Sequence, residues 1–365
     1  MVEWKKLGEV CTILRGNRVT KGELVDNGKF PVISGGVTPM GFIDSYNREP
    51  NTITVSQYGT AGYVDFQYSR FWANDICYCV YPEKSVDNKY LWYVLKSKQD
   101  LLYAIRNTDA TPYSLPVDTL KSILIPIPSL EEQTRIVGIL DTFTASIENL
   151  KEQIAERRKQ YEHYRDQLLD LEGKEDIVSW GDVCEMIKGN GVQKVDFVES
   201  GRGCIHYGQI YTHYGSFTYT TNKYVSEEVF EKAKKASNGD LIMTDTSENV
   251  EDICKTVAYL GEEDIAVSNH ALIIKHKQNP KYLSFSTQTN SFLTQKRKVV
   301  VGVKVSGIKP EHLAQIKIYL PSIEEQSRIV SILDTFESSI QNLEAQLKER
   351  EKQYEYYRNK LLTFE

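Results

Sequence analysis

One stretch of sequence occurs twice in this chain, and it decides the fold. Residues 128–169 read PSLEEQTRIVGILDTFTASIENLKEQIAERRKQYEHYRDQLL, and residues 321–362 read PSIEEQSRIVSILDTFESSIQNLEAQLKEREKQYEYYRNKLL. The two stretches align without a gap at an offset of 193, and two thirds of their positions are identical. A repeat of this length predicts a molecule built from two copies of one unit.

Each copy predicts a long helix with a defined start and a coiled-coil seam. Ser129 and Glu132 form the S-x-x-E pattern of a capping box, and the second copy repeats it with Ser322 and Glu325. Gly173 suits a left-handed cap at the end of the first helix. Apolar and aromatic residues recur at alternating steps of four and three through five heptads, which predicts a coiled coil of two helices, each roughly 60–65 Å long.

The seam also indicates how the two helices pair. In a parallel, in-register pair, Arg157 and Arg350 would share one layer, and two buried like charges in contact are costly. An antiparallel pair need not bring them together, and it follows from a two-fold relation between two copies of one unit. The alternative is that each helix packs on its own domain without pairing.

Length, composition and charge bound the class of protein. The chain has 365 residues, 41% of them hydrophobic and 26% charged, which is typical of globular domains. We find no apolar run of membrane-spanning length and no secretory signal, and the six cysteines lack a disulfide framework. These features predict a reduced, cytoplasmic protein that does not enter the membrane.

The helices divide the chain into globular segments 1–128 and 173–321 and helical segments 129–172 and 322–365. The net charge of −6 lies on the helices, since the four segments in chain order carry +1, −4, 0 and −3. The globular segments share anchors, such as Leu7-Gly8-Glu9-Val10-Cys11 with Trp180-Gly181-Asp182-Val183-Cys184, and Lys89-Tyr90-Leu91 with Lys281-Tyr282-Leu283. Between the anchors they differ, which suggests one fold that serves two different targets.

Both globular segments read as short strands with a few short helices. The expected strands are Phe30–Ser34, Thr52–Ser56, Ile76–Tyr81, Asp240–Thr244, Thr256–Leu260 and Ala271–Lys275, and the expected helices are Asn88–Lys96, Glu227–Ala236 and Pro280–Gln288. The fold class is therefore α+β: two globular α/β domains separated by two long helices that form an antiparallel coiled coil, with an internal pseudo-two-fold repeat.

The chain lacks the motifs of common catalytic and metal sites. It has no zinc-ligand spacing, no phosphate-binding G-x-x-x-x-G-K-[ST] loop and no Asn/Asp-Pro-Pro-aromatic tetrapeptide of amino-methyltransferases, and its six histidines do not cluster in sequence. We therefore expect no catalytic residue, no metal site and no cofactor in this chain.

The loops instead carry side chains that can read base edges or hold phosphates, although polar, glycine-rich stretches are as often plain turns. In the first segment the candidates for DNA binding are Arg15, Asn17, Ser34, Thr38, Gln57, Tyr58, Thr60, Arg106, Tyr113 and Ser114. In the second they are Lys188, Asn190, His206, Gln209, Tyr211, His213, Thr246, Asn249, Lys296, Arg297 and Lys298. We expect the run Lys296-Arg297-Lys298 to contact phosphates.

This arrangement resembles the specificity subunit of type I restriction–modification systems. The resemblance covers the whole chain, and its most specific marks are the phrases Pro128-Ser129-Leu130-Glu131-Glu132-Gln133 and Pro321-Ser322-Ile323-Glu324-Glu325-Gln326, each leading into Arg-Ile-Val and a five-heptad helix. Asn238-Gly239-Asp240-Leu241-Ile242 is similar to the family's strand entry in a target recognition domain. The first segment has Glu49-Pro50-Asn51-Thr52-Ile53-Thr54 in its place, so its loop assignments are less direct.

The resemblance implies a non-catalytic subunit with several partners. Residues 1–128 and 173–321 would be target recognition domains, each reading one half of a bipartite site in double-stranded DNA, and the helices would set the spacing. Two methyltransferase subunits, which use S-adenosylmethionine, would dock at the repeats, and restriction subunits, which use ATP and magnesium, would complete the complex. The docking candidates are Glu131, Glu132, Arg135, Glu324, Glu325 and Arg328. The alternatives are a coiled-coil adaptor that joins two proteins, and an enzyme with an unrecognised site in residues 173–321.

Overall fold

The computed structural model describes residues 2–109, 111–300 and 306–364. The chain forms two compact units, one from residues 1–152 and 345–365 and the other from residues 153–344. Each unit therefore contains one globular domain, part of the first long helix and part of the second.

The two long helices form where the repeat predicts them. Helix α5 covers Leu130–Leu169, and helix α12 covers Ile323–Leu362. The Ser129 hydroxyl accepts the Glu132 N–H at 3.3 Å, and the second copy repeats this cap at the same distance. Gly173 has a φ of +71°, the left-handed conformation expected after a helix end.

The reciprocal half of the predicted capping box is absent at both helix starts. The Glu132 carboxylate turns forward and accepts two hydrogen bonds from Arg135, at 2.7 and 2.6 Å, and Glu325 accepts two from Arg328, both at 2.7 Å. A bidentate guanidinium–carboxylate pair is stronger than a single bond to a backbone N–H, so the glutamate takes the arginine three residues on.

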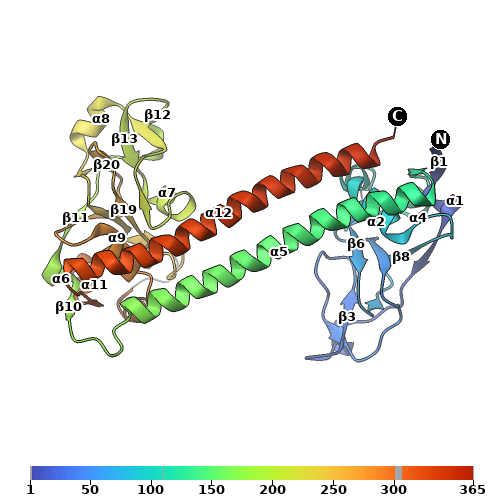
Figure 1. The fold of residues 1–365 in the computed structure, drawn as a ribbon, viewed down its shortest axis with the longest axis horizontal. Helices are drawn as coiled ribbons and strands as arrows, with labels where there is room; N and C mark the ends of the chain where they lie inside the picture. Colours follow the sequence, from blue (N-terminus) through green and yellow to red (C-terminus); the bar gives the residue numbers. More distant parts are fainter. Residues whose placement is uncertain (1, 110, 301–305, 365) are drawn as a thin grey trace. The chain divides into compact units, whose positions relative to one another are not determined.

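In each unit the segments of α5 and α12 run in opposite directions (Figure 1). In the first unit Phe143 stacks on Tyr357, with ring centroids 5.3 Å apart, and in the second Tyr164 stacks on Phe336 at the same distance. Each partner is related to its counterpart by the repeat offset of 193, which gives the pairing its pseudo-two-fold symmetry.

The two seam arginines confirm the reasoning that favoured an antiparallel pair. Arg350 lies over the ring of Phe143, 5.7 Å from its centroid, and Arg157 lies over the ring of Phe336 at 5.9 Å. Each guanidinium therefore meets an aromatic face of the opposite helix instead of the other arginine.

The first unit contains three small sheets. Their strands, in the order in which they pair, are β1 (Glu3–Lys6) with β9 (Leu124–Ile127); then β2 (Cys11–Arg15), β8 (Cys77–Pro82), β5 (Thr52–Ser56) and β6 (Val64–Gln67); then β4 (Phe42–Ile43), β3 (Phe30–Ile33) and β7 (Trp72–Ala73). The helices are α1 (Leu7–Val10), α2 (Asn88–Ser97), α3 (Gln99–Ala104) and α4 (Val117–Lys121), with a 3₁₀ turn at Lys21–Glu23.

The second unit repeats this plan with more strands. One sheet pairs β10 (Ile177–Ser179) with β23 (Lys317–Tyr319), and another pairs β18 (Thr246–Ser247) with β22 (Ser306–Gly307). The main sheet has the strand order β11 (Cys184–Lys188), β21 (Ala271–His276), β17 (Leu241–Thr244), β19 (Thr256–Tyr259) and β14 (Phe217–Thr218). A further sheet has the strand order β12 (Phe197–Val198), β15 (Lys223–Val225), β13 (Arg202–Ile205), β20 (Ile265–Val267) and β16 (Lys235–Ala236). The helices are α6 (Trp180–Val183), α7 (Tyr207–Thr212), α8 (Glu227–Lys232), α9 (Pro280–Ser286), α10 (Asn290–Val299) and α11 (Pro310–Leu313), with a 3₁₀ turn at Lys194–Asp196.

The expected strands and helices are present, with one correction. The helix expected at Glu227–Ala236 ends at Lys232, and its last two residues form β16. Lys235 pairs with Ala266 of β20, and Ala236 is fully buried. Sheet pairing across 31 residues of sequence therefore overrides the local helical pattern.

The phrases shared by the two globular segments fasten each domain to a long helix. The Lys89 ammonium pairs with Asp141 of α5 at 2.7 Å, and Lys281 pairs with Asp334 of α12 at 2.8 Å. The adjacent tyrosines repeat each other too, because the hydroxyl of Tyr90 donates to Pro126 O in β9 and that of Tyr282 to Tyr319 O in β23.

A second shared feature is a glycine at which two helices approach closely. A Cβ on Gly8 would lie 2.9 Å from the Lys121 Cβ, and a Cβ on Gly181 would lie 2.7 Å from the Ala314 Cβ. Only glycine permits these contacts, which explains why the two otherwise different segments both have one there.

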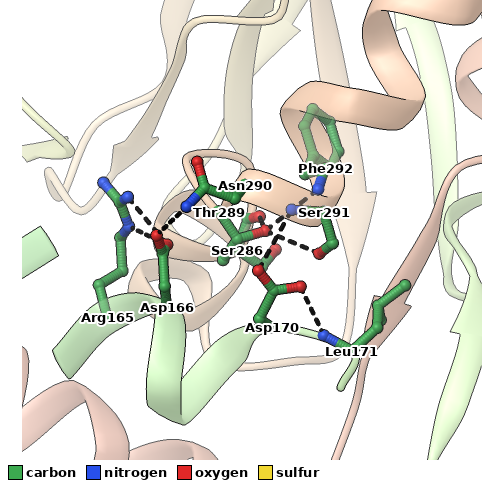
Figure 2. A network of polar contacts seen from close by, with 9 residues as sticks. All are labelled: Arg165, Asp166, Asp170, Leu171, Ser286, Thr289, Asn290, Ser291 and Phe292. Carbon is green, nitrogen blue, oxygen red and sulfur yellow. Dashed lines mark hydrogen bonds and ion pairs between the residues drawn. The ribbon is translucent and has the colours of Figure 1, made fainter. Parts of the chain in front are cut away.

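The end of α5 is fastened to the second domain by polar contacts (Figure 2). Asp166 accepts a hydrogen bond from the Asn290 amide at 2.6 Å, and Asp170 accepts the backbone N–H of Ser291 at 3.3 Å. Both residues belong to the first turn of α10, and the backbone N–H of Ser291 is one of those that lack a partner within the helix.

Candidate nucleic-acid interface

The strand order gives each main sheet two different ends. In the first unit Arg15 at the end of β2 is opposite Tyr78 in β8, and Ser56 at the end of β5 is opposite Cys77. The loops that leave β2 and β5 and the loop that enters β8 therefore share one end of the sheet. At the other end β2 begins directly after α1, whose Leu7 N–H donates to Ile123 O beside β9. We call the end at which β2 and β5 stop and β8 starts the free end. Figure 1 shows β3 on that side and α2 beside α5.

Three candidate loops of the first unit meet at its free end. The Thr60 N–H donates to Gly35 O at 2.8 Å, and the Leu115 N–H donates to Gln57 O at 2.8 Å. Tyr58 and Ser114 form an isolated β-bridge. These contacts bring together residues 34–38, 57–62, 106–109 and 111–115, as a shared binding surface requires.

Cations and tyrosines alternate on this surface. The Arg106 guanidinium lies between the rings of Tyr103 and Tyr113, 5.3 and 4.6 Å from their centroids. Arg15 lies over Tyr78 at 5.6 Å. Tyr58, Tyr113, Asn17 and Thr38 are exposed, and Thr60 and Ser114 are half-buried. Such a surface can stack on bases and donate to base edges or phosphates.

Two candidates of the first unit hold the surface from below. Ser34 and Gln57 are buried, and the Ser34 hydroxyl accepts a hydrogen bond from the buried amide of Asn74 at 3.3 Å. The same amide group of Asn74 accepts the Val19 N–H, so it joins three segments. Because their side chains are buried, Ser34 and Gln57 support the loops and are not exposed on the surface that the loops form.

The free end of the second unit is the end at which β11 and β17 stop and β21 begins, since Lys188 pairs with Leu272 and Thr244 with Ala271. It gathers a different set of side chains. Lys188 at the end of β11 pairs with Asp245 at 3.3 Å, and Thr246 donates to the same carboxylate at 2.8 Å. His270 precedes β21 and lies 4.0 Å from Asp245. The Tyr211 hydroxyl donates to Thr246 O, which joins α7 to this group.

Two further candidates of this unit are structural. His206 and Gln209 do not lie in a loop; they begin the short helix α7. The His206 ring accepts the Gly208 N–H, Gln209 Oε1 accepts the His206 N–H, and the Gln209 amide donates to Asn222. Both side chains are buried, and burial lowers the pKa of His206. Because both residues stand at the start of a helix, their polar groups form hydrogen bonds within the domain.

The structure contradicts the expectation that Lys296 contacts phosphates. Residues 296–298 lie in α10, and Lys296 is 1% exposed, with its ammonium donating to Glu251 O at 2.9 Å and Ile253 O at 3.0 Å. Burial lowers the pKa of this ammonium. Arg297 is exposed and donates three hydrogen bonds to Glu251, and Lys298 is exposed. One face of α10 packs against the domain, and successive side chains of a helix point in different directions around its axis. Three consecutive cations of this helix therefore cannot all face solvent.

The remaining candidates of the second unit lie at its surface. Asn190, His213 and Asn249 are exposed. Asn190 accepts the Lys234 N–H at 2.8 Å, and the Asn249 amide donates to Asp252 at 2.7 Å. His213 packs edge-on against Tyr214. None of the three contacts the group around Asp245 in the part of the chain that the structure describes.

The docking candidates lie on the first turns of α5 and α12. Glu131, Glu324, Arg135 and Arg328 are exposed, and the two bidentate pairs described above tie the arginines to Glu132 and Glu325. The first residues of the helices, Leu130 and Ile323, are 51% and 46% exposed and are related by the repeat. Each helix start thus presents an apolar residue beside an acidic pair.

Some residues of both regions were missed by the sequence reasoning. Asp245 and His270 are 25 residues apart, and a single sequence carries no sign that they meet. Gln133 and Gln326 are not among the predicted site residues, although both are fully buried. Their repetition at the two helix starts was the signal that could have revealed them.

The described residues contain no group of three or more His, Cys, Asp or Glu side chains that could hold a metal ion. Among these residues we also find no helix long and apolar enough to cross a membrane.

Comparison with known proteins gives consistent results over the full chain. It is 28% identical to a putative type I restriction enzyme specificity subunit of Haemophilus influenzae, with 100% of this chain and 96% of that protein covered. It is 29% identical to the EcoR124I/EcoR124II specificity subunit of Escherichia coli, with 100% and 94% covered.

Solved structures agree with the fold. The crystal structure of the type I restriction–modification S subunit from M. genitalium matches with a TM-score of 0.67 at 18% identity, covering 100% of this chain and 97% of that one. The family model of the type I restriction modification DNA specificity domain matches residues 1–157 and 173–351, once in each half of the repeat. The chain therefore belongs to the family of type I restriction–modification specificity subunits, with one DNA specificity domain in each half.

Proposed function

We propose that this chain is the DNA sequence-recognition subunit of a type I restriction–modification complex. Each globular domain reads one half of a bipartite site, and the antiparallel helices set the spacing and dock methyltransferase subunits. One observation carries the proposal: the two domains share a framework but present different chemistry at the same structural position. Arg15 lies against Tyr78 in the first domain, whereas its counterpart Lys188 lies against Asp245 in the second.

This pattern fits recognition of two different sequences. The framework anchors face the long helices, where both halves have the same task, and they are repeated. The free ends differ, as two readers of different base sequences must, because each base pair presents its own donors and acceptors in the major groove. An adaptor for two proteins would not require a basic residue and further hydrogen-bonding side chains at the corresponding place in both domains.

The helix starts support docking of one kind of partner twice. The pairs Glu132–Arg135 and Glu325–Arg328 have the same geometry to within 0.1 Å, and Leu130 and Ile323 flank them. A repeated surface binds two copies of one partner, which we take to be a methyltransferase subunit. Catalysis then resides in the partners: S-adenosylmethionine binds to the methyltransferase, and ATP and magnesium bind to the restriction subunits when these are present.

The test is to reconstitute the chain with its methyltransferase and to sequence the methylated adenines. We expect a bipartite motif. Replacing Arg106 with Gln and Tyr113 with Ala together should change only the half-site read by the first domain, because the two side chains contact each other in a loop at the free end of that domain. Changes in both half-sites would contradict independent reading, and methylation without any sequence preference would favour an adaptor.

Docking is tested by exchanging the charges of one pair. The double variant Glu132→Arg with Arg135→Glu keeps the ion pair within the helix but reverses the charges seen by a partner. We expect one methyltransferase subunit to dissociate more readily, and the matched exchange at Glu325 and Arg328 to affect the other. Native mass spectrometry counts the bound subunits, and full assembly of both exchange variants would exclude these surfaces.

A further inference from the structure

Three ionisable side chains meet at the free end of the second domain. Asp245 lies directly after β17, Lys188 ends β11 and His270 precedes β21. The Lys188 ammonium lies 3.3 Å and the His270 Nδ1 lies 4.0 Å from the Asp245 carboxylate. The side chain of Asp245 is 7% exposed, whereas those of Lys188 and His270 are 65% and 53% exposed. The acid is therefore enclosed, and its two partners extend past it into solvent.

The position of Asp245 is fixed by its surroundings. Its side chain accepts the Thr246 hydroxyl at 2.8 Å, its N–H donates to His270 O at 3.2 Å, and its carbonyl accepts the Ile308 N–H at 3.0 Å. The Thr246 bond and the Lys188 ion pair hold the carboxylate, and the two backbone bonds hold the main chain that carries it. An enclosed carboxylate needs cationic or donor partners, and Lys188 and His270 are the groups placed to supply them.

His270 is held in a conformation that non-glycine residues rarely adopt. Its φ is +64°, in the left-handed region. The two residues before it are bound by neighbouring segments, since the Tyr207 N–H donates to the Ser268 hydroxyl at 2.9 Å and the Gly191 N–H donates to Asn269 Oδ1 at 3.0 Å. Backbone strain of this kind persists only where the surroundings impose it, and it is concentrated at functional sites.

We propose that Asp245 is a positioning residue that holds Lys188 and His270 side by side, and that this pair reads a guanine in the half-site of the second domain. This inference rests on the proposed function. Lysine has only donors, and guanine is the base that presents two acceptors, O6 and N7, in the major groove. The His270 Nδ1 faces Asp245 and Thr246, whose hydroxyl already donates to Asp245, so Nδ1 carries the ring proton and the Nε2 of the neutral ring is an acceptor for the N4 amino group of the cytosine paired with that guanine.

The counterpart in the first domain supports a role in specificity. Arg15 occupies the position of Lys188, but it lies over Tyr78 and its carbonyl accepts a hydrogen bond from Arg48. If the ion pair served only to stabilise the fold, the shared framework would be expected to repeat it, as it repeats Lys89–Asp141 in Lys281–Asp334. The Asp245 group is instead specific to one domain, like the sequence that domain would read.

The experiment uses the reconstituted complex with its methyltransferase and a panel of duplexes in which each base pair of the motif is replaced in turn. The variants are Lys188→Met, Asp245→Asn and His270→Asn, the last chosen because asparagine tolerates a positive φ. Lys232→Met on α8 removes one equally exposed charge outside the group and serves as the control. Hydrogen exchange of peptides from residues 153–344 verifies that the second unit remains folded.

The expected result is a change at one position of one half-site. Lys188→Met should reduce the preference for guanine there by about 5- to 150-fold, the range for losing a good base contact. Asp245→Asn and His270→Asn should reduce the same preference at the same position, and Lys232→Met should leave the profile unchanged. All other positions, and the other half-site, should keep their preferences.

Other outcomes overturn the inference in distinguishable ways. A uniform loss of affinity for every duplex in Lys188→Met would make Lys188 a phosphate contact. A uniform loss in Asp245→Asn, with Lys188→Met unchanged, would make Asp245 purely structural. If the unaltered complex itself shows no sequence preference, the proposed function fails before any variant is compared.

Discussion

Replacing Gln133 with Leu should destabilise the first unit strongly, because this glutamine joins the start of α5 to the start of α2. Its Oε1 accepts the Asp87 N–H at 2.7 Å, and its Nε2 donates to Ser85 O at 3.1 Å and to Pro128 O at 2.9 Å. The side chain is fully buried, so water cannot replace these bonds. Leucine has a similar volume and leaves no large cavity, which isolates the polar contribution.

The magnitude follows from the three bonds. Each buried hydrogen bond contributes about 1 kcal/mol net, so the free energy of unfolding of the first unit should fall by about 3 kcal/mol. With a urea dependence of about 2 kcal/mol per molar, the unfolding midpoint of that unit should fall by about 1.5 M. Because the chain has two units, a single global transition is not assumed.

Pulsed hydrogen exchange with mass spectrometry along a urea titration resolves the two units by their peptides. Gln326 makes the matching contacts in the second unit, since it accepts the Asn279 N–H at 3.0 Å and donates to Gln278 at 3.0 Å and to Pro321 O at 2.8 Å. Gln326→Leu should therefore shift the second unit more than the first, and Gln133→Leu the reverse.

The control is Thr134→Leu, an exposed position one residue along α5. It should change stability by less than about 0.5 kcal/mol, as surface substitutions do. If Gln133→Leu unfolds within that same margin of the parent, the buried amide does not fasten the helix to the domain, and the structural reasoning is wrong.

Three further outcomes are expected. Burial raises the pKa of the Glu337 carboxyl above its ordinary value, so the folded state binds the proton more tightly than the unfolded state. The stability of the parent should therefore fall as the pH rises from the pKa of the unfolded state through the raised pKa of the folded state. In thermal unfolding, Glu337→Gln should be as stable as the parent at low pH and more stable at neutral pH, and a constant difference in stability across the pH range would contradict this. Deleting one heptad from each helix, Leu150–Glu156 and Leu343–Glu349, removes about 10 Å of helix, so the unread gap of the motif should shorten by about three base pairs in sequencing of methylated adenines, while an unchanged gap would show that the helices are not a spacer. The isolated chain, with its net charge of −6, should bind DNA weakly at physiological salt, and nanomolar specific binding in a titration without methyltransferase would refute that.

The organisation of the molecule was predictable from its sequence. Helix α5 and helix α12 are marked by a periodic seam, a serine cap and a gapless repeat, and such patterns indicate a regular structure from neighbouring residues alone. The antiparallel pairing was predictable as well. A parallel, in-register pair would place Arg157 and Arg350 in one layer, and two copies of one unit favour a two-fold relation; in the structure each arginine lies over an aromatic ring of the opposite helix.

The roles of individual loop residues were decided only by the tertiary structure. Lys296 has the sequence of an exposed cation, and it is buried because α10 turns that face toward the carbonyls of residues 251 and 253. His206 and Gln209 resemble base readers and instead begin a helix. Asp245 and His270 become neighbours because β17 and β21 pair in one register. A polar side chain has the same composition in a cap, a core or a binding surface, and which of these it serves depends on what distant segments of the chain place around it.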